Sequence, residues 1–114
     1  MKLSQPDDLG HNVVTMFSHT VESCNILTIQ AGTNCPQGGD SGHGGRTVLR
    51  LINESCTDLR VRVNGGAVRE VEKIEIILGG DCEAHSLAKG LEFAVKVLNS
   101  QLRRDLAGRD ERVA

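Results

Sequence analysis

The sequence predicts an α+β fold: a small antiparallel sheet of about four strands packed against a C-terminal amphipathic helix. Three observations lead to this prediction. Short β-branched segments fill the middle of the chain, short polar links join most of them, and a long segment follows with apolar residues every three or four positions. Short links favour antiparallel pairing, and an amphipathic helix must cover one face of the sheet. The length of 114 residues is enough for one domain.

Residues 1–24 are polar and weakly patterned, so we expect an N-terminal arm with a short helical turn around 13–17. The predicted strands lie in four later segments: 26–31, 47–52, 59–63 and about 71–78. In 59–63 apolar and basic residues alternate, which indicates a half-buried strand with Arg60 and Arg62 on its outer face. The turn-forming residues Asn64-Gly65-Gly66 follow that segment directly.

The last predicted element is a helix. Asp81 is a good N-cap, and Glu83 places an acidic residue in the first turn. Apolar residues then recur at three- and four-residue steps from Ala84 to Leu102. From Arg103 onward the sequence becomes charged, so we expect the helix to fray there. The predicted organisation is an arm at 1–24, a ligand-binding α+β domain at 25–108 and a charged tail at 109–114.

Composition excludes several classes of protein. Lys and Arg total 13 and Asp and Glu total 15, and the resulting net charge of −2 excludes a globally basic nucleic-acid coat. No apolar run approaches the ~20 residues that a membrane helix needs. The first residues contain no apolar secretory segment, so a cytosolic location is expected.

The chain is poor in aromatic residues, with two Phe and no Tyr or Trp. Its core must therefore rest on Val, Ile and Leu, and so short a chain buries only a modest fraction of its surface. We expect further burial between subunits, and therefore a homo-oligomer. A small monomer with an aliphatic core is the alternative.

Cysteine and histidine spacing gives no metal motif. No two of the four cysteines form a C-x-x-C pair, so a zinc site could be assembled only from distant positions. Reduced structural thiols are the expectation, with no metal and no cofactor. The residues concerned are Cys24, Cys35, Cys56, Cys82, His11, His19, His43 and His85.

The outstanding feature is a glycine-rich loop at 32–45, which holds six of the 13 glycines. Glycine lets backbone N–H groups approach a ligand closely. A P-loop is excluded because Gly-Lys-Ser/Thr is absent, and a strand rather than a helix follows the loop. A structural turn or a subunit-packing loop is the alternative to a ligand loop.

Polar residues in and after this loop suit an anionic ligand. Asp40 and His43 can fix polar groups, and the Arg46 guanidinium can fork onto phosphate or stack on a base. Ser41 lies in a Gly-Asp-Ser-Gly sequence like that around the nucleophile of chymotrypsin-like proteases. Those enzymes need two barrels, a base and an orienting acid, so we predict no catalytic residue here.

Arginines are concentrated in the predicted sheet and at the helix end. Arg103 and Arg104 can serve a ligand or complement the helix macrodipole. The conjunction of an amide-rich loop with several arginines in an otherwise acidic chain indicates an anionic ligand. The sheet arginines are Arg46, Arg50, Arg60, Arg62 and Arg69.

Three motifs carry a resemblance to a known family: 31–47 with Gly38-Gly39-Asp40-Ser41-Gly42-His43-Gly44-Gly45-Arg46-Thr47, then 63–66, then 78–81. Over roughly residues 26–102 the chain resembles phage anti-Thoeris cyclic-nucleotide sponges of the first-described family. The resemblance implies compact β-plus-helix subunits that form dimers and hexamers. It also implies sequestration, without cleavage, of glycocyclic ADP-ribose, and in some members of CBASS-type cyclic trinucleotides at a second site.

The resemblance also suggests where a ligand binds. It points to the loop from Gly38 to Thr47, with Asp81 beside adenine or ribose and Arg103 or Arg104 as a second stacking group. Where that family has an aromatic platform after the Asn-Gly-Gly turn, this chain has Val71. The predicted ligand-binding residues are Gly38, Gly39, Asp40, His43, Gly44, Gly45, Arg46, Thr47, Asp81, Arg103 and Arg104.

The resulting prediction is a phage immune-evasion protein, acting in the cytoplasm of the infected bacterial host, that is not an enzyme. Its partners are a cyclic nucleotide or cyclic ADP-ribose-type molecule and further copies of itself, with no polymeric nucleic acid and no membrane. Two alternatives stay open: a hydrolase of such signals with His43 as acid or base, and a structural phage protein whose glycine loop only packs subunits.

Overall fold

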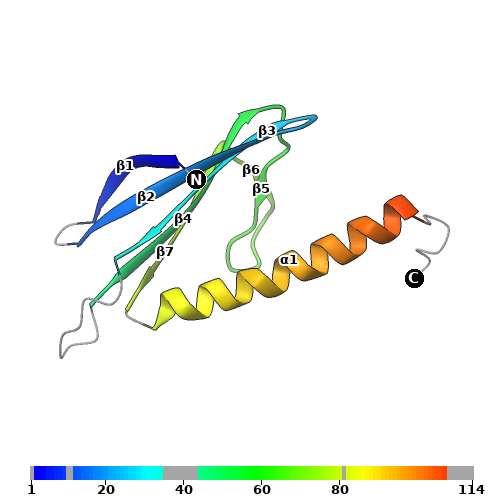
Figure 1. Cartoon of the computed structure of the whole chain (residues 1–114). Helices are drawn as coiled ribbons and strands as arrows, with labels where there is room; N and C mark the ends of the chain where they lie inside the picture. Colours follow the sequence, from blue (N-terminus) through cyan, green and yellow to red (C-terminus); the bar gives the residue numbers. More distant parts are fainter. Residues whose placement is uncertain (1, 10–11, 35–43, 81, 108–114) are drawn as a thin grey trace. The chain divides into compact units, whose positions relative to one another are not determined.

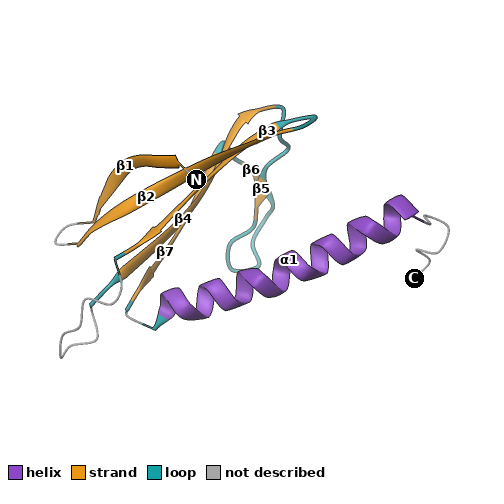
Figure 2. Cartoon of the chain, in the orientation of Figure 1, coloured by secondary structure: helices purple, strands orange, loops and turns teal. Residues whose placement is uncertain are grey.

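The structure, a computed structural model, describes residues 2–9, 12–34, 44–80 and 82–107. It has the predicted α+β class, with an antiparallel sheet of five strands and a single C-terminal helix in the described part of the chain (Figures 1 and 2). The chain divides into two compact units, Met1–Ala84 and His85–Ala114. The first unit contains all the described strands.

The main sheet has the strand order β1-β2-β3-β4-β7, with every neighbouring pair antiparallel. The long β3 and β4 pair over eight consecutive residues of β3, so they form the centre of the sheet. The strands are β1 (Lys2–Leu9), β2 (Asn12–Glu22), β3 (Ile26–Thr33), β4 (Arg46–Ser55) and β7 (Lys73–Gly79).

The segment 1–24, which the sequence predicted to be an arm, instead supplies two strands of the main sheet. Residues 2–9 and 12–22 form β1 and β2, and the helical turn expected around 13–17 is wrong because this segment is extended. In β2 the fully buried Val14 and Met16 alternate with exposed neighbours, which is the period of a strand with one buried face. The exposed apolar residues Val13, Phe17 and Val21 on the other face of β2 conceal that period in the sequence.

The segment predicted as a strand at 59–63 leaves the main sheet. Only Arg60–Val61 (β5) is extended, and it pairs with Arg69–Glu70 (β6) in a separate two-stranded sheet. The predicted turn between them is confirmed. Asn64 and Gly65 have φ of 54° and 69°, as a type I′ turn requires, and the Gly66 N–H donates to the Val63 carbonyl oxygen at 2.9 Å.

The centre of the core is small and aliphatic. Val14 and Met16 of β2 and Val48 of β4 are fully buried. Gly32 lies opposite Val48 in the β3–β4 pairing. Because β3 lies between β2 and β4 and has no side chain at this position, the buried side chains of β2 and β4 can approach each other across it. A Cβ on Gly32 would collide with the Thr15 carbonyl oxygen and lie 3.0 Å from the Met16 sulfur. The core therefore depends on glycine at position 32.

The helix α1 (Glu83–Ala107) begins with an acidic residue in its first turn, as predicted. An N-terminal acidic side chain is stabilised by the positive end of the helix dipole. The predicted N-cap, Asp81, lies outside the described residues. Among the residues that the structure describes, no helix is both long enough and apolar enough to cross a membrane.

Replacing Gly32 with Ala should lower the free energy of unfolding by about 2–3 kcal/mol, because the new methyl group collides with backbone rather than with a flexible side chain. Chemical denaturation measures the loss. Gly90→Ala is the matched control, since nothing lies within 4 Å of that position and alanine favours the helix. Equal stability of the Gly32→Ala and parent proteins would contradict the packing described here.

Candidate functional site

The two ends of the glycine-rich loop are fastened to each other by hydrogen bonds. The Asn34 N–H donates to the Arg46 carbonyl oxygen at 3.1 Å, and the Arg46 N–H donates to Asn34 Oδ1 at 2.7 Å. The Thr33 hydroxyl donates to the same Arg46 carbonyl oxygen at 3.1 Å. The loop therefore starts and ends on a closed base formed by the last residues of β3 and the first of β4.

Asn34 also connects this base to β2. Its side-chain Nδ2 donates to the Val13 carbonyl oxygen at 3.2 Å. One side chain therefore satisfies a backbone donor of β4 and a backbone acceptor of β2. Such side-chain bonds to the backbone substitute for the ladder where regular pairing ends.

Thr47 lies beneath the base. Its side chain is only 8% exposed, and its hydroxyl lies 2.9 Å from the hydroxyl of Thr33. In this chain the predicted ligand residue Thr47 thus joins β3 to β4.

The Arg46 side chain lies across the end of β7. Its Nη1 donates to the Gly45 carbonyl oxygen at 2.8 Å. A Cβ on Gly79, the residue opposite Arg46 in the β4–β7 pairing, would lie 3.4–3.7 Å from atoms of the guanidinium group. The guanidinium therefore lies close to the β7 backbone at Gly79, where a Cβ would make ordinary van der Waals contact with it.

Gly80 completes this corner of the sheet. Its N–H donates to the Gly45 carbonyl oxygen at 2.8 Å, and its φ of 122° favours glycine. A Cβ at this position would also collide with the Glu83 carboxylate. The corner thus brings a guanidinium and a carboxylate close to three backbone positions that lack side chains: Gly45, Gly79 and Gly80. This arrangement suits a ligand with both anionic and hydrogen-bond-donating groups.

The structure brings together part of the predicted site. Gly44, Gly45, Arg46 and Thr47 lie at the loop base. Arg103 and Arg104 lie near the C-terminal end of α1, and the Arg103 side chain is exposed. The other predicted residues lie outside the described residues: Gly38, Gly39, Asp40, His43 and Asp81.

Two residues at this corner were not predicted as site residues. Asn34 had a usable signal, since an asparagine directly after a strand and before a glycine-rich loop favours side-chain bonding to backbone. Glu83 was expected only in the first turn of the helix, and its position over Gly80 depends on the backbone conformation there.

A second arginine, Arg50, belongs to a polar row that crosses the sheet. It donates to Gln30 Oε1 at 2.6 Å and to Glu75 Oε2 at 2.8 Å, and its side chain is 14% exposed. Through successive cross-strand pairs the row continues to Ser18 and Lys2. Arg50 is therefore bound into the sheet.

Arg60 also has a partner close in sequence. Its Nε lies 2.7 Å from Asp58 Oδ1, and that hydrogen bond, followed by the charge of Asp58, raises the pKa of the Arg60 guanidinium. Both side chains are exposed, so water screens the pair and it adds little to stability.

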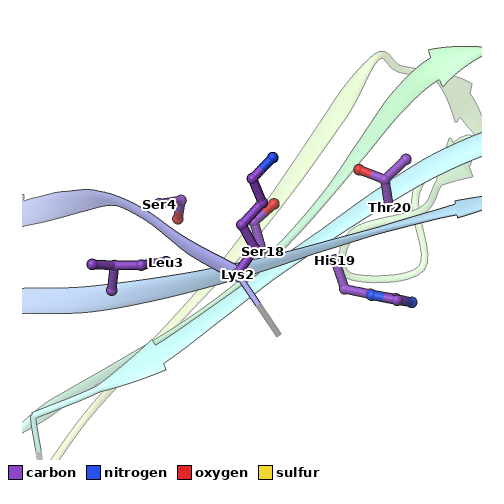
Figure 3. A pocket seen from close by; sticks show the side chains of 6 residues that line it. All are labelled: Lys2, Leu3, Ser4, Ser18, His19 and Thr20. Carbon is purple, nitrogen blue, oxygen red and sulfur yellow. The ribbon is translucent and has the colours of Figure 1, made fainter.

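A hollow of about 400 Å³ lies where the polar row reaches β1 and β2 (Figure 3). The Lys2, Ser18 and Thr20 side chains point to one side of the strands and His19 to the other. The Ser4 hydroxyl is buried and has no partner among the described residues. The hollow is lined by Lys2, Leu3, Ser4, Ser18, His19 and Thr20.

No described group of three His, Cys, Asp or Glu residues is placed to hold a metal ion. Three of the cysteines, Cys24, Cys56 and Cys82, are exposed and have free thiols. Cys35 lies outside the described residues. Comparisons of the chain with protein-family models, with curated proteins and with solved structures each found no match.

Replacing Asn34 with Ala should lower the free energy of unfolding by about 1–3 kcal/mol, because it leaves the Arg46 N–H and the Val13 carbonyl without their side-chain partner. It should also speed hydrogen exchange at the Arg46 amide. Asn25→Ala is the control, since it removes a side-chain bond to Thr57 instead. If both variants exchange the Arg46 amide at the same rate, the hydrogen bond from the Arg46 N–H to Asn34 Oδ1 is not formed.

Proposed function

We propose that this protein binds and sequesters a cyclic nucleotide defence signal, glycocyclic ADP-ribose first and also cyclic tri- or dinucleotides, without cleaving it. It would act as a phage immune-evasion protein in the cytoplasm of the infected bacterial host. The observation that carries the proposal is the position of Arg46, held over Gly79 at the closed base of the glycine-rich loop. The resemblance of the 31–47 segment to anti-Thoeris sponges supports the same function.

In this proposal the loop supplies the phosphate contacts. Backbone N–H groups of the loop would donate hydrogen bonds to phosphate oxygens, since successive backbone amides in a glycine-rich segment can form an anion-binding concavity. The residues are Gly38, Gly39, Gly44 and Gly45. The Arg46 guanidinium would add charge and a two-pronged hydrogen bond to the same phosphates. This division of work explains why the loop is rich in glycine and is followed at once by arginine.

Other residues would recognise the nucleoside. Asp40, His43 and Asp81 would hydrogen-bond ribose hydroxyls or base edges. Because Val71 stands where the sponge family has an aromatic platform, base stacking would fall to the guanidinium group of Arg46. The Glu83 carboxylate, close to Gly80, would favour the donor groups of a base or ribose over a purely anionic ligand.

Tight binding requires enclosure. A nanomolar Kd corresponds to about −12 kcal/mol, which a small ligand reaches only when most of its surface is buried. A chain of 114 residues offers little depth by itself. The proposal therefore includes pockets between subunits, in dimers that assemble into hexamers.

Calorimetric titration of the full chain with cyclic ADP-ribose isomers and with cyclic di- and trinucleotides tests the proposal. Each mixture is then heat-denatured and the released small molecules are chromatographed. A sponge should bind one class tightly and release it intact. Recovery of a cleaved product would favour a hydrolase, and the absence of binding to every ligand would favour a structural protein whose glycine loop packs subunits.

Arg46→Ala should raise the Kd for the bound ligand by about 100-fold, equivalent to about 2.7 kcal/mol, because phosphate contacts to a guanidinium are charge-assisted. Arg62→Ala, the same change at an exposed residue beside β5, should leave the Kd within a factor of two or so. Calorimetry on both variants measures the difference. Equal Kd values for the two variants would contradict a role for Arg46 in binding.

A further inference from the structure

The two edges of the main sheet differ in their resistance to strand addition. At one edge, β1 contains Pro6, which lacks an N–H, and its pairing with β2 shifts register between Ser4 and Asp7. Proline and irregular pairing are devices that stop a further strand from joining an edge. At the other edge, β7 has neither a proline nor a register shift over its seven residues, Lys73–Gly79. Of the two edge strands that the structure describes, β7 is therefore the one without such a device.

The hydrogen-bond pattern identifies the groups that β7 presents outward. The Asn53 N–H donates to the Glu72 carbonyl and the Gly80 N–H donates to the Gly45 carbonyl, so even-numbered residues of this segment bond to β4. The N–H and C=O groups of the odd-numbered residues then point away from the sheet. These residues are Lys73, Glu75, Ile77 and Gly79. Together they offer a regular ladder for an extended chain.

We infer that β7 pairs antiparallel with β7 of a second copy of this chain, in the register centred on Ile76. This register pairs all seven residues of one strand with all seven of the other. It places Lys73 opposite Gly79, Glu75 opposite Ile77, and Ile76 opposite itself. The outward N–H and C=O groups of both strands then find partners along the whole edge.

Neighbouring registers fit less well. Centring the pair on Glu75 puts two carboxylates directly opposite each other, which is destabilising. Centring it on Ile77 places Ile74 opposite Gly80, whose φ of 122° is not that of a strand. In the register centred on Ile76, Lys73 faces a residue without a side chain, and Glu75 is already held by Arg50 at 2.8 Å within its own sheet.

Side-chain packing favours the same pairing. In that register Ile76 meets its symmetry mate, and Ile74 meets Leu78, as non-hydrogen-bonded pairs whose side chains approach most closely. Ile76 and Ile77 are 43% and 51% exposed in the single chain, so a partner strand would cover apolar surface there. The result is one continuous sheet across two subunits.

This inference concerns the sheet edge alone and does not depend on the proposed ligand. It can be tested without any nucleotide, so its failure and the failure of the proposed function are distinguishable. A partner strand from an unrelated protein would use the same edge but would not require the self-matching register. A register-specific experiment separates these outcomes.

Single cysteines placed in a background with Cys24, Cys35, Cys56 and Cys82 changed to Ser give the first test. Ile76→Cys should form a covalent dimer under mild oxidation, because two residues on the symmetry axis lie opposite each other at disulfide distance. Ile74→Cys alone should not, since it faces Leu78 of the other copy. The double variant Ile74→Cys with Leu78→Cys should recover the covalent dimer.

Hydrogen exchange on the unmodified chain gives a second test that needs no variant to fold. At high protein concentration the amides of Lys73, Glu75, Ile77 and Gly79 should be protected, and dilution should remove that protection while Ile74, Ile76 and Leu78 remain protected by β4. Unprotected outer amides at every concentration, or equal crosslinking of Ile74→Cys and Ile76→Cys, would overturn the inference.

Discussion

The hydrogen bonds between Asn34 and Arg46 are the constraint on which the other features of the sheet end depend. They close β3 against β4 just where the glycine-rich loop departs, and the Asn34 side chain extends the closure to Val13 of β2. Once the Arg46 backbone is held, its side chain can lie across β7 at Gly79. A change in these hydrogen bonds would therefore shift the Arg46 backbone, the Arg46 guanidinium and its contact with β7 together.

Three glycines at or beside strand ends, Gly32, Gly79 and Gly80, differ in what surrounds them. A Cβ at Gly32 would collide with the backbone carbonyl of Thr15, and one at Gly80 would collide with the end of the flexible Glu83 side chain, whereas at Gly79 it would make ordinary contact with the Arg46 guanidinium. Only Gly80 among these also has a left-handed φ. Close approach of a backbone group accounts for glycine at position 32, and backbone conformation accounts for it at position 80.

The central elements could be predicted from the sequence because their signals are local. β3, β4, β7, α1 and the Asn64-Gly65 turn each follow from the residues within the element. β1 and β2 could not: in β2 exposed apolar residues such as Val13 and Phe17 stand beside the buried Val14 and Met16 and hide the alternation. The site divides in the same way. The loop base and Arg46 were predictable as a motif, and Asn34 had a local signal as the asparagine between a strand and a glycine-rich loop, whereas the position of Glu83 depends on the backbone conformation at Gly80.

The proposed function assigns the ligand to Arg46 at the end of the sheet and gives no part to Arg50 in its middle. Arg50 donates to Gln30 and Glu75 in a row whose members lie opposite one another on adjacent strands, so a ligand would have to displace side chains held by the sheet. Removing such a partner leaves a carboxylate without its cation, which costs stability. Arg46 instead follows a glycine-rich loop, lies over a glycine, and donates to a backbone oxygen of Gly45. In the proposed function, a guanidinium in this position would meet the same ligand as the backbone amides of the loop.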